Sequence, residues 1–512
     1  MFHVETSTRI RRASSLTLSI LIMSGLILIM TNRALAQDSN GVDKIEAISK
    51  RLEELEKQIQ ALKLENAELK KKFGEKETST EAVAAEKKSS AVEAPKVAVA
   101  QEENKSAKKE SRFEFGGEIR LRPEVRNNDL NSFTSGLDSL VSQRVRLHVT
   151  AKLTNDVSGF VEVQDSRLWG TFGGSLNFHQ AYIQVDHFLT PDLSLRIGRQ
   201  ELSYGNERLV GAFDWDNVGR SFDAIKAVYV KKKWSADVFA ARLVDQHGFF
   251  PNQGGDDDEG YPPLPHQEFY GAYLKFLNDS PNHKLEVYGF LLRDNFARRG
   301  EVGRNTDSTN IWTVGTRQEL RSNSGFYFDG EFAFQTGNLG PNDHRALALA
   351  GTVGKRFSSA GLPHAGFEYD FATGDGDFRD GKSREFINLF PDNHIHYGYM
   401  DLLGWRNMHD FRFNFGFDPT SKLSFDADYH KFLLHKGDGR WSNASGFTLG
   451  FDPSGGSGSE IGQELDFTLR FPYKEHLNFL AGYSLFLPGR FAKLTRTSDL
   501  SHFSYIQTRI NF

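Results

Sequence analysis

The feature that most constrains the fold is a two-residue alternation of apolar and charged side chains in roughly the last 400 residues. In residues 117–125, Ile119, Leu121 and Val125 share one strand face, and charged side chains share the other. Residues 144–153 repeat this pattern. Such a period predicts β-strands with one apolar and one polar face. In a soluble sandwich the apolar face forms a core, whereas in a transmembrane barrel it contacts lipid.

The connections between these strands distinguish the two folds. Residues 127–139 and 201–220 are long connections, whereas 154–159 and 231–233 are short, and long and short alternate along the chain. Outer-membrane barrels show this alternation, with long loops outside and tight turns at the periplasmic side. We therefore predict an all-β fold, a transmembrane antiparallel β-barrel of about 18 strands. An α-helical coiled coil is expected to precede it.

The composition is compatible with a barrel. The mean hydropathy of −0.48 suits a membrane barrel because only every second strand residue contacts lipid. The 43 phenylalanines can supply interfacial girdles, and the absence of cysteine agrees with an oxidising compartment. A formal charge of −5 argues against bulk binding of nucleic acid. We therefore expect outer-membrane lipid, and no nucleic acid, among the partners.

The N-terminal residues divide into two functional segments. Residues 1–36 contain arginines, an apolar run and the motif Ala34-Leu35-Ala36, which together predict a secretory signal peptide; an uncleaved signal anchor is the alternative. Residues 37–73 are predicted to form a periplasmic coiled coil, because a heptad repeat extends from Ile45 to Phe73. A single solvated helix is the alternative. This segment, Ile45–Phe73, would support self-association or binding of a periplasmic partner.

A linker separates the coiled coil from the barrel. Residues 74–111 are rich in Lys, Glu, Ala and Ser, and such a composition buries too little apolar surface to fold. We predict that 74–111 is a disordered linker and that 112–512 form the outer-membrane barrel.

Charged side chains of the predicted strands suggest the lumen's chemistry. Carboxylates such as Glu118 and Glu162 are expected on the inner wall. Clustered guanidinium groups indicate an anion path, because arginine binds carboxylates bidentately and charged rings in a lumen set selectivity. For any single arginine, the alternative is the charge ladder that fills any barrel interior. The arginines that strand alternation places inside are Arg120, Arg122, Arg144, Arg146, Arg196, Arg412, Arg470 and Arg509.

Residues 180–229 and their flanks contain a set of short motifs. These are Gln180-Ala181-Tyr182, Arg196-Ile197-Gly198-Arg199-Gln200, Leu209-Val210-Gly211, Gly219-Arg220-Ser221-Phe222-Asp223, Gln164-Asp165-Ser166-Arg167 and His396-Tyr397-Gly398. With these motifs the segment resembles the signature region of the alginate export porin family. The resemblance implies an eighteen-stranded monomeric barrel that exports uronic-acid polymers through an arginine-rich constriction, gated by loops and a periplasmic turn. The N-terminal coiled coil and linker depart from the simplest members of that family.

Several signature residues are predicted to contact the polymer. Strand alternation places Arg199 and Arg196 on opposite faces, so a lumen position for Arg199 requires a bulge or a strand that enters its loop. For Asp214 and Asp216 the alternative is an ordinary loop cap. In the signature, Arg167, Arg196, Arg199 and Arg220 are the expected polymer contacts, and Asp165, Asp214 and Asp216 are expected to orient them. Arg120, Arg122, Arg144, Arg146 and Arg412 complete the expected substrate-binding set.

Other chemistry has little support in the sequence. We expect no resident cofactor. The acidic clusters 256–259 and 375–380 could bind calcium, although solvated loop charge is the commoner origin of such clusters. The chain has no G-x-S-x-G elbow and no phosphate-binding loop, so we do not predict an enzyme.

The sequence thus predicts an outer-membrane channel that passes an anionic polysaccharide, an alginate-like polyuronate, through an arginine-lined pore. The expected location is the cell outer membrane, with the N-terminal segment in the periplasm. The alternatives are a general or small-anion porin, an envelope-tethering barrel whose coiled coil binds the cell wall, and a barrel-embedded hydrolase.

Overall fold

The structure is a computed structural model that describes residues 112–132, 136–171, 174–243, 267–277, 282–302 and 306–512. The predicted signal peptide, coiled coil and linker all lie outside these residues. In the described part, no helix is long and apolar enough to cross a membrane.

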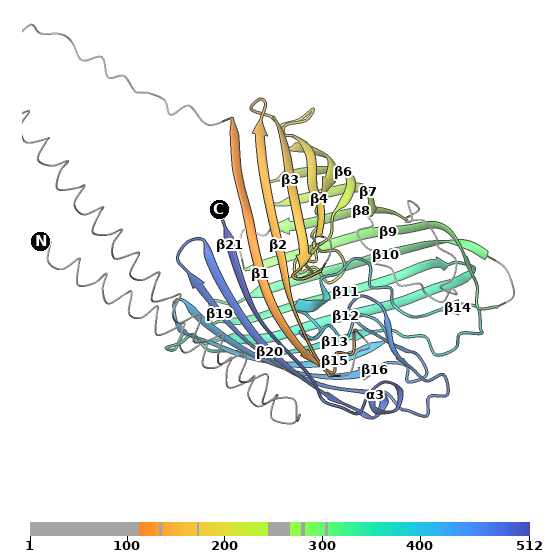
Figure 1. Cartoon of the computed structure of the whole chain (residues 1–512). Coiled ribbons are helices and arrows are strands. Elements are labelled where there is room, and N and C mark those ends of the chain that lie inside the picture. The colour runs from red at the N-terminus through yellow and green to blue at the C-terminus, as the bar shows by residue number, and fades with distance from the viewer. Residues whose placement is uncertain (1–111, 133–135, 172–173, 244–266, 278–281, 303–305) are drawn as a thin grey trace, which may run out of the picture. The chain divides into compact units, whose positions relative to one another are not determined.

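One antiparallel sheet closes on itself to form a barrel. β1 (Phe113–Asn127) pairs with β2 (Leu137–Lys152) and also with the last strand, β21 (Ser501–Asn511). Figure 1 shows β21 beside β1. The sheet has 19 strands; without the two-residue β14 (Lys382–Ser383), which pairs parallel with β12, the barrel has 18. The predicted antiparallel barrel and its strand number are therefore confirmed.

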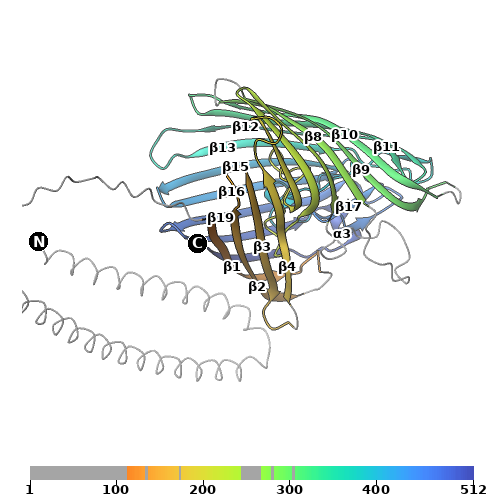
Figure 2. The same cartoon turned by 90° about the horizontal axis from the view of Figure 1, so that it is seen from above.

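The remaining strands of the sheet follow in chain order, and the neighbours β12, β13, β15, β16 and β19 can be followed in Figure 2. They are β3 (Val157–Leu168), β4 (Gly174–Val185), β5 (Leu193–Gln200), β6 (Phe222–Lys231), β7 (Trp234–Leu243), β8 (Gln267–Leu277), β9 (His283–Arg299), β10 (Thr306–Arg321), β11 (Phe326–Leu339), β12 (Asn342–Arg356), β13 (His364–Ala372), β15 (Met408–Thr420), β16 (Leu423–Leu434), β19 (Glu460–Tyr473) and β20 (Leu477–Pro488). Outside this sheet lie the hairpin β17 (Arg440–Ser442) and β18 (Thr448–Phe451), the 3-10 helix η1 (Asn393–Ile395) and the helix α3 (Arg490–Thr495).

The predicted alternation is visible in the strands as exposed apolar faces. On β15, Phe413 and Phe415 are 54% and 50% exposed, whereas Asp410 on the opposite face is buried. On β2, Leu147 is 53% exposed and the adjacent Arg146 is buried. Large apolar side chains on an outer surface are stable in hydrocarbon, not in water. The apolar faces are therefore the lipid-contacting surface.

Most of the long connections lie at one end of the barrel, which we call the long-loop end. They include 201–221, 373–407 and 435–459, whereas the connections at the other end, such as 232–233 and 421–422, are short turns. Two differences from the sequence prediction occur at the long-loop end. β3 and β4 extend toward each other, so their connection is only 169–173, and 340–341 is a two-residue turn.

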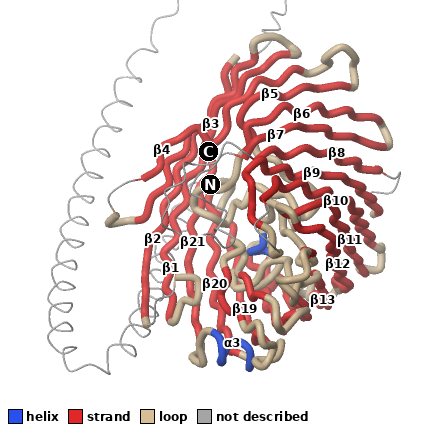
Figure 3. The backbone as a smooth tube through the Cα atoms, turned by 90° about the vertical axis from the view of Figure 1, so that its right-hand side faces the viewer, coloured by secondary structure: helices blue, strands red, loops and turns tan. Residues whose placement is uncertain are grey.

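Two long loops turn into the barrel, where Figure 3 shows loop segments inside the ring of strands. We call 201–221 the first inner loop and 373–407 the second. They pair in parallel at Val210 and Phe390, and the Gly211 amide donates to the Phe390 carbonyl at 2.8 Å. The two loops therefore form one hydrogen-bonded unit that fills much of the lumen.

An aromatic cluster supports this unit from the wall. Phe222, Phe239, Phe269 and Phe290 on β6–β9 point inward and are at most 3% exposed. Phe269 packs against Phe390 of the second inner loop, with ring centroids 4.8 Å apart. The inner wall formed by β6–β9 is apolar because it packs against a folded loop and does not contact water.

Candidate functional site in the barrel lumen

Arginines from three neighbouring strands form a row on the inner wall. Arg144 of β2 lies opposite Arg120 of β1, which in turn lies opposite Arg509 of β21. Arg120 and Arg144 are 1% and 0% exposed. Like charges on adjacent positions repel, so this row requires anionic or strongly polar partners.

The first inner loop supplies a carboxylate to this row. The Nη2 atoms of Arg144 and Arg509 donate to the two carboxylate oxygens of Asp214, each at 2.6 Å. Glu118 also accepts from Arg144, at 2.9 Å, and lies 3.2 Å from Nε of Arg509. Burial alone would raise the pKa of Asp214, but the charges of Arg144 and Arg509 hold it well below its usual value. Asp214 is therefore anionic at neutral pH.

The backbone of residues 214–218 lies along the same wall, and each of its five carbonyls accepts a hydrogen bond from a wall side chain. Arg120 donates to the carbonyls of residues 214 and 216 at 2.5 and 2.7 Å, and Arg122 donates to that of residue 215 at 2.7 Å. Ser166 and Gln164 donate to the last two carbonyls at 2.7 and 2.8 Å. The wall thus holds a string of oxygen acceptors together with one carboxylate.

Three other expected site residues have identifiable partners. Arg196 lies on the inner wall, donates to Gln184 at 2.9 Å and stacks over Tyr182. Arg412 is also on the inner wall and donates to Asp428 at 2.7 Å. Arg146 donates to Gln164 at 2.6 Å and lies 3.7 Å from the Asp214 carboxylate. These three arginines are bound to the wall's own polar side chains.

Arg220 joins the two inner loops. It is buried and donates to the carbonyls of Gly211 and Pro391 at 3.2 and 2.9 Å, and also to that of Phe390. Burial lowers the pKa of Arg220 to about 10. The guanidinium thus stabilises the loop unit, and it is not directed at open lumen space.

Three expected site residues lie on the outward face of the barrel. Asp165 and Arg167 of β3 are ion-paired with each other, and Asp165 lies opposite Val145 on the lipid-contacting face. Arg199 is two residues from the exposed Ile197, and the β4–β5 and β5–β6 registers contain no bulge that would turn it inward. The placement of these side chains in the lumen was therefore wrong, because strand alternation continues to the strand ends.

Asp216 acts as a loop cap, which was the alternative prediction for it. Its carboxylate accepts from the amides of Val218 and Gly219 at 2.7 and 3.2 Å. It fixes the turn that presents the preceding carbonyls to the arginine row.

The sequence analysis missed Arg208, in the first inner loop. Its guanidinium is buried, pairs with Glu368, lies 3.3 Å from Asp370 and donates to the Tyr397 hydroxyl at 3.0 Å. Burial opposes the charged form of Arg208, but Asp370 and the other acidic neighbours raise its pKa well above the usual value. Alternation gives no signal for a residue in a loop, and its neighbours lie more than 150 positions away.

The lumen wall between β11 and β19, which we call the acidic wall, carries buried carboxylates. Between the second inner loop and this wall is a pocket of about 300 Å³ lined by Tyr399, Arg412 and Arg470 together with three carboxylates. The expected arginine lining is thus limited to β21, β1 and β2, with single arginines elsewhere. The buried carboxylates of the acidic wall are Glu331, Glu368, Asp370, Asp410, Asp428, Glu464 and Asp466.

The acidic cluster 375–380 holds backbone groups. Asp375 accepts from the amides of Asp377 and Arg384 at 3.1 and 2.8 Å. Among the described residues, no group of three or more His, Cys, Asp or Glu side chains is placed to hold a metal ion. The other cluster, 256–259, lies outside the described residues.

Several solved structures share this fold, and one of them is named as an outer membrane protein. OccK11 (OpdR) of Pseudomonas aeruginosa superposes with a TM-score of 0.52 at 11% identity, covering 78% of this chain and 96% of that one. The outer membrane protein opdK of Pseudomonas aeruginosa gives 0.50 at 10% identity, with coverage of 78% and 99%. OccAB4 of Acinetobacter baumannii gives 0.51 at 11%, with 78% and 98%. At such identities the likeness establishes the barrel fold alone.

The family comparison is more specific. A search of curated proteins finds no match. The alginate export family, in contrast, matches residues 111–505, which is nearly the whole barrel. Together with the closed barrel and its apolar outer face, this makes the protein an outer-membrane channel and not an enzyme. The chain belongs to the alginate export family.

Proposed function

We propose that this channel passes an anionic polysaccharide, an alginate-like polyuronate, along the arginine row of β21, β1 and β2. The supporting observation is the occupant of that row: five successive carbonyls and the carboxylate of Asp214 accept hydrogen bonds from arginine, glutamine-amide and serine-hydroxyl donors of the wall. A polyuronate is likewise a chain of oxygen acceptors with regularly spaced carboxylates. Arginine's planar fork suits this chemistry.

The polymer passes by exchanging places with the first inner loop on the arginine row. The first inner loop occupies the row, so the polymer replaces the loop's acceptors as the loop withdraws. Buried donors left without partners would cost about 1–3 kcal/mol each, and a neutral sugar could not replace the charge of Asp214. The exchange therefore favours polyanions over neutral polymers of equal length.

Planar-bilayer recordings test this proposal. We expect uronate oligomers to block the current of the full-length protein, and neutral glucose oligomers of the same length to block it much less. Arg120→Gln together with Arg144→Gln should weaken the uronate block, whereas Arg321→Gln, an exposed arginine at the short-turn end of β10, should not. A cation-selective current that uronate oligomers leave unchanged would refute the proposal.

A second candidate is a small-anion porin. The folded loops leave a pocket of only about 300 Å³ beside Arg412 and Arg470, which has room for a small solute and not for a polymer. Competition experiments separate the two functions. If chloride passes freely and uronate oligomers do not compete with it, the small-anion function is the correct one.

For the N-terminal residues we propose export through the signal peptide 1–36, and a periplasmic coiled coil at Ile45–Phe73 that binds itself, a helper protein or the cell wall. The heptad repeat supports this proposal. Deleting 45–73 should change the cross-linked oligomer pattern or envelope integrity without altering single-channel conductance. An unchanged envelope and oligomer pattern would refute it.

A further inference from the structure

The outward face of β5–β9 carries a row of charged side chains near the long-loop end. Arg199, Asp223, Arg242, Glu268 and Arg293 lie opposite one another on consecutive strands. All five belong to the lipid-contacting face, because each is two residues along its strand from an outward side chain such as Ile197 or Tyr270. A charged row on this face lies at the headgroup level, because charges at the bilayer midplane are costly.

The row has one positive charge in excess. Arg199 donates to both carboxylate oxygens of Asp223, at 2.9 and 3.1 Å. Glu268 accepts from Arg242 at 3.3 Å and from the Tyr270 hydroxyl at 2.9 Å. Arg293 is exposed and forms no ion pair with any residue that the structure describes. Three arginines against two carboxylates leave a net charge that one phosphate would neutralise.

Directly below the charged row, toward the short-turn end, lies an apolar trough. Its floor is formed by the small residues Ala227, Ala240, Ala272 and Gly289, which lie on four neighbouring strands. The trough has a volume of about 590 Å³. A second depression, of about 390 Å³, shares Ile225, Ala240 and Tyr270 with the trough and is also lined by members of the charged row. It therefore connects the trough to the charged row. The side walls of the trough are Ile225, Val238, Tyr270, Leu291 and Trp312.

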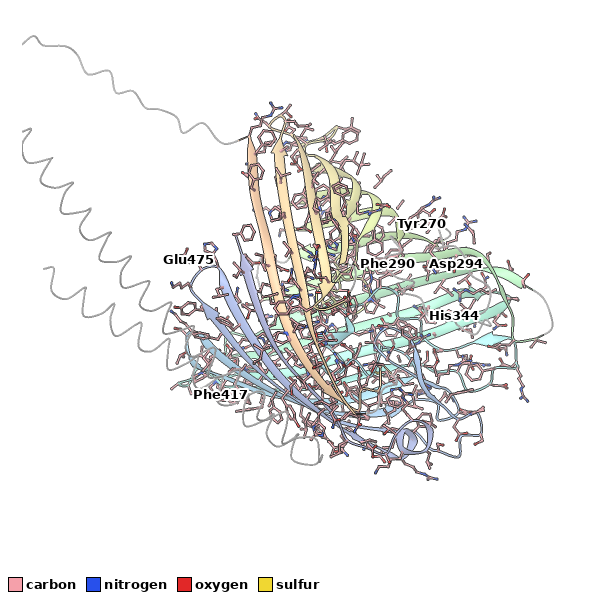
Figure 4. All side chains as sticks on the ribbon, viewed as in Figure 1. Tyr270, Phe290, Asp294, His344, Phe417 and Glu475 are labelled. Carbon is pink, nitrogen blue, oxygen red and sulfur yellow. The ribbon has the colours of Figure 1, made fainter. Side chains whose placement is uncertain are left out.

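The trough is a feature of the outer surface. On β8 and β9, Tyr270 faces outward and is 36% exposed, whereas Phe290 faces inward and is 1% exposed; both are labelled in Figure 4. A Cβ atom added to Gly289 would meet no atom within 4 Å, so the floor of the trough is open. The absence of side chains there leaves space that only an external molecule can fill.

We propose that the trough and the charged row above it bind one phosphate-bearing lipid of the outer leaflet, with an acyl chain in the trough and the phosphate on Arg242 and Arg293. Two features of the site support this occupant. The apolar floor lies in the hydrocarbon layer, where acyl chains are the available ligand, and the arginine fork matches phosphate geometry. The long-loop end of an outer-membrane barrel faces outside, which assigns the lipid to the outer leaflet.

Native mass spectrometry of the detergent-solubilised full chain, given an equimolar mixture of phosphatidylglycerol and phosphatidylcholine, tests the charge contact, because both lipids carry a phosphate and only phosphatidylglycerol has a net negative charge. The wild type should retain phosphatidylglycerol preferentially. In Arg242→Gln combined with Arg293→Gln, this preference should fall about tenfold or more, because an arginine near an anionic lipid is worth about fivefold in affinity. Arg321→Gln at the opposite rim is the matched control and should keep it. Equal retention of the two lipids by the wild type would overturn the proposal.

A second variant tests the trough itself. Gly289→Leu fills the floor without a clash and should reduce retention of both lipids, whereas Gly351→Leu, another outward position with no atom within 4 Å of an added Cβ, should not. Displacement of the retained lipid by millimolar inorganic phosphate alone would also count against the acyl-chain contact. Retention by Gly289→Leu equal to that of the wild type would overturn it.

Discussion

The contact between Asp214 and the arginine row allows a quantitative prediction about channel opening. In Asp214→Asn the side chain keeps its shape but loses the charge that binds Arg144 and Arg509, both at 2.6 Å. A fully buried charged hydrogen bond contributes about 1.5–3 kcal/mol and an exposed ion pair at most about 1 kcal/mol. Because the Asp214 side chain is 44% exposed, we take about 2 kcal/mol for both contacts together.

This energy stabilises the loop on the wall and is absent once the loop has withdrawn. Losing about 2 kcal/mol should therefore raise the ratio of withdrawn to docked loop about thirtyfold. Single-channel recording measures this as an increase in open probability at fixed voltage. The carbonyl contacts of Arg120 and Arg122 remain in the variant, so the open state should still close intermittently.

The matched control is Asp165→Asn. It removes the same charge from a residue on the outward face, paired with Arg167, and should leave the open probability unchanged. The thermal transition of the barrel should be the same in both variants, because neither side chain contributes to strand pairing. An open probability in Asp214→Asn no higher than in Asp165→Asn would refute the reasoning.

Three further predictions concern the loops and the trough. Arg208→Gln should destabilise the folded chain by about 3–5 kcal/mol, measured by urea unfolding in detergent, because the buried carboxylate of Asp370 loses its cation and Glu368 keeps only Arg412. Burial raises the pKa of Asp392 to about 6, above the ordinary value of about 3.9. The contribution of Asp392 to loop stability is therefore full below pH of about 4 and lost as the pH rises through 6. The Asp392 amide, which donates to the Glu207 carbonyl, should exchange its hydrogen more slowly, relative to its intrinsic rate, at pH 5 than at pH 7.5, and equal protection at both pH values would contradict this. Gly289→Leu should fold normally, whereas Gly271→Leu should not, because an added Cβ would lie 2.3 Å from the buried ring of Phe239; heat-modifiable gel mobility distinguishes the two.

The strands and the arginine row were predictable from sequence because both follow a two-residue period. Arg120, Arg144 and Arg509 each lie on a polar face opposite apolar neighbours, and the strand register then brings the three together. The same rule, applied without exception, would also have placed Asp165 and Arg167 outward. The family signature overrode it, since a motif marks which residues recur and not which way they point.

The inner loops were not predictable in this way. Trp215 of the first loop stacks on His394 of the second, with ring centroids 3.8 Å apart, although 178 residues separate them in the chain. Similarly, Phe222 and Phe269 give β6 and β8 apolar inner faces because Phe390 packs against both. Such contacts depend on long-range packing, for which no local period exists.

The acidic wall is compatible with transport of a polyanion because side chains of the wall itself bind some of its carboxylates. Asp428 accepts from Arg412, and a carboxylate oxygen of Asp410 lies 2.7 Å from Nδ1 of His430. The arginine row differs, since three guanidiniums have one fixed carboxylate, Glu118, and one carried by a loop.

Withdrawal of that loop therefore leaves two uncompensated positive charges on one side of the lumen, counted as three arginines less Glu118. In a narrow, low-dielectric bore such a local excess concentrates anions, even though the chain as a whole has a formal charge of −5. The same excess draws the loop back when no polyanion is present. One charged loop residue thereby couples closure of the channel to the absence of its proposed substrate, and Asp214→Asn should weaken closure more than it weakens the uronate block.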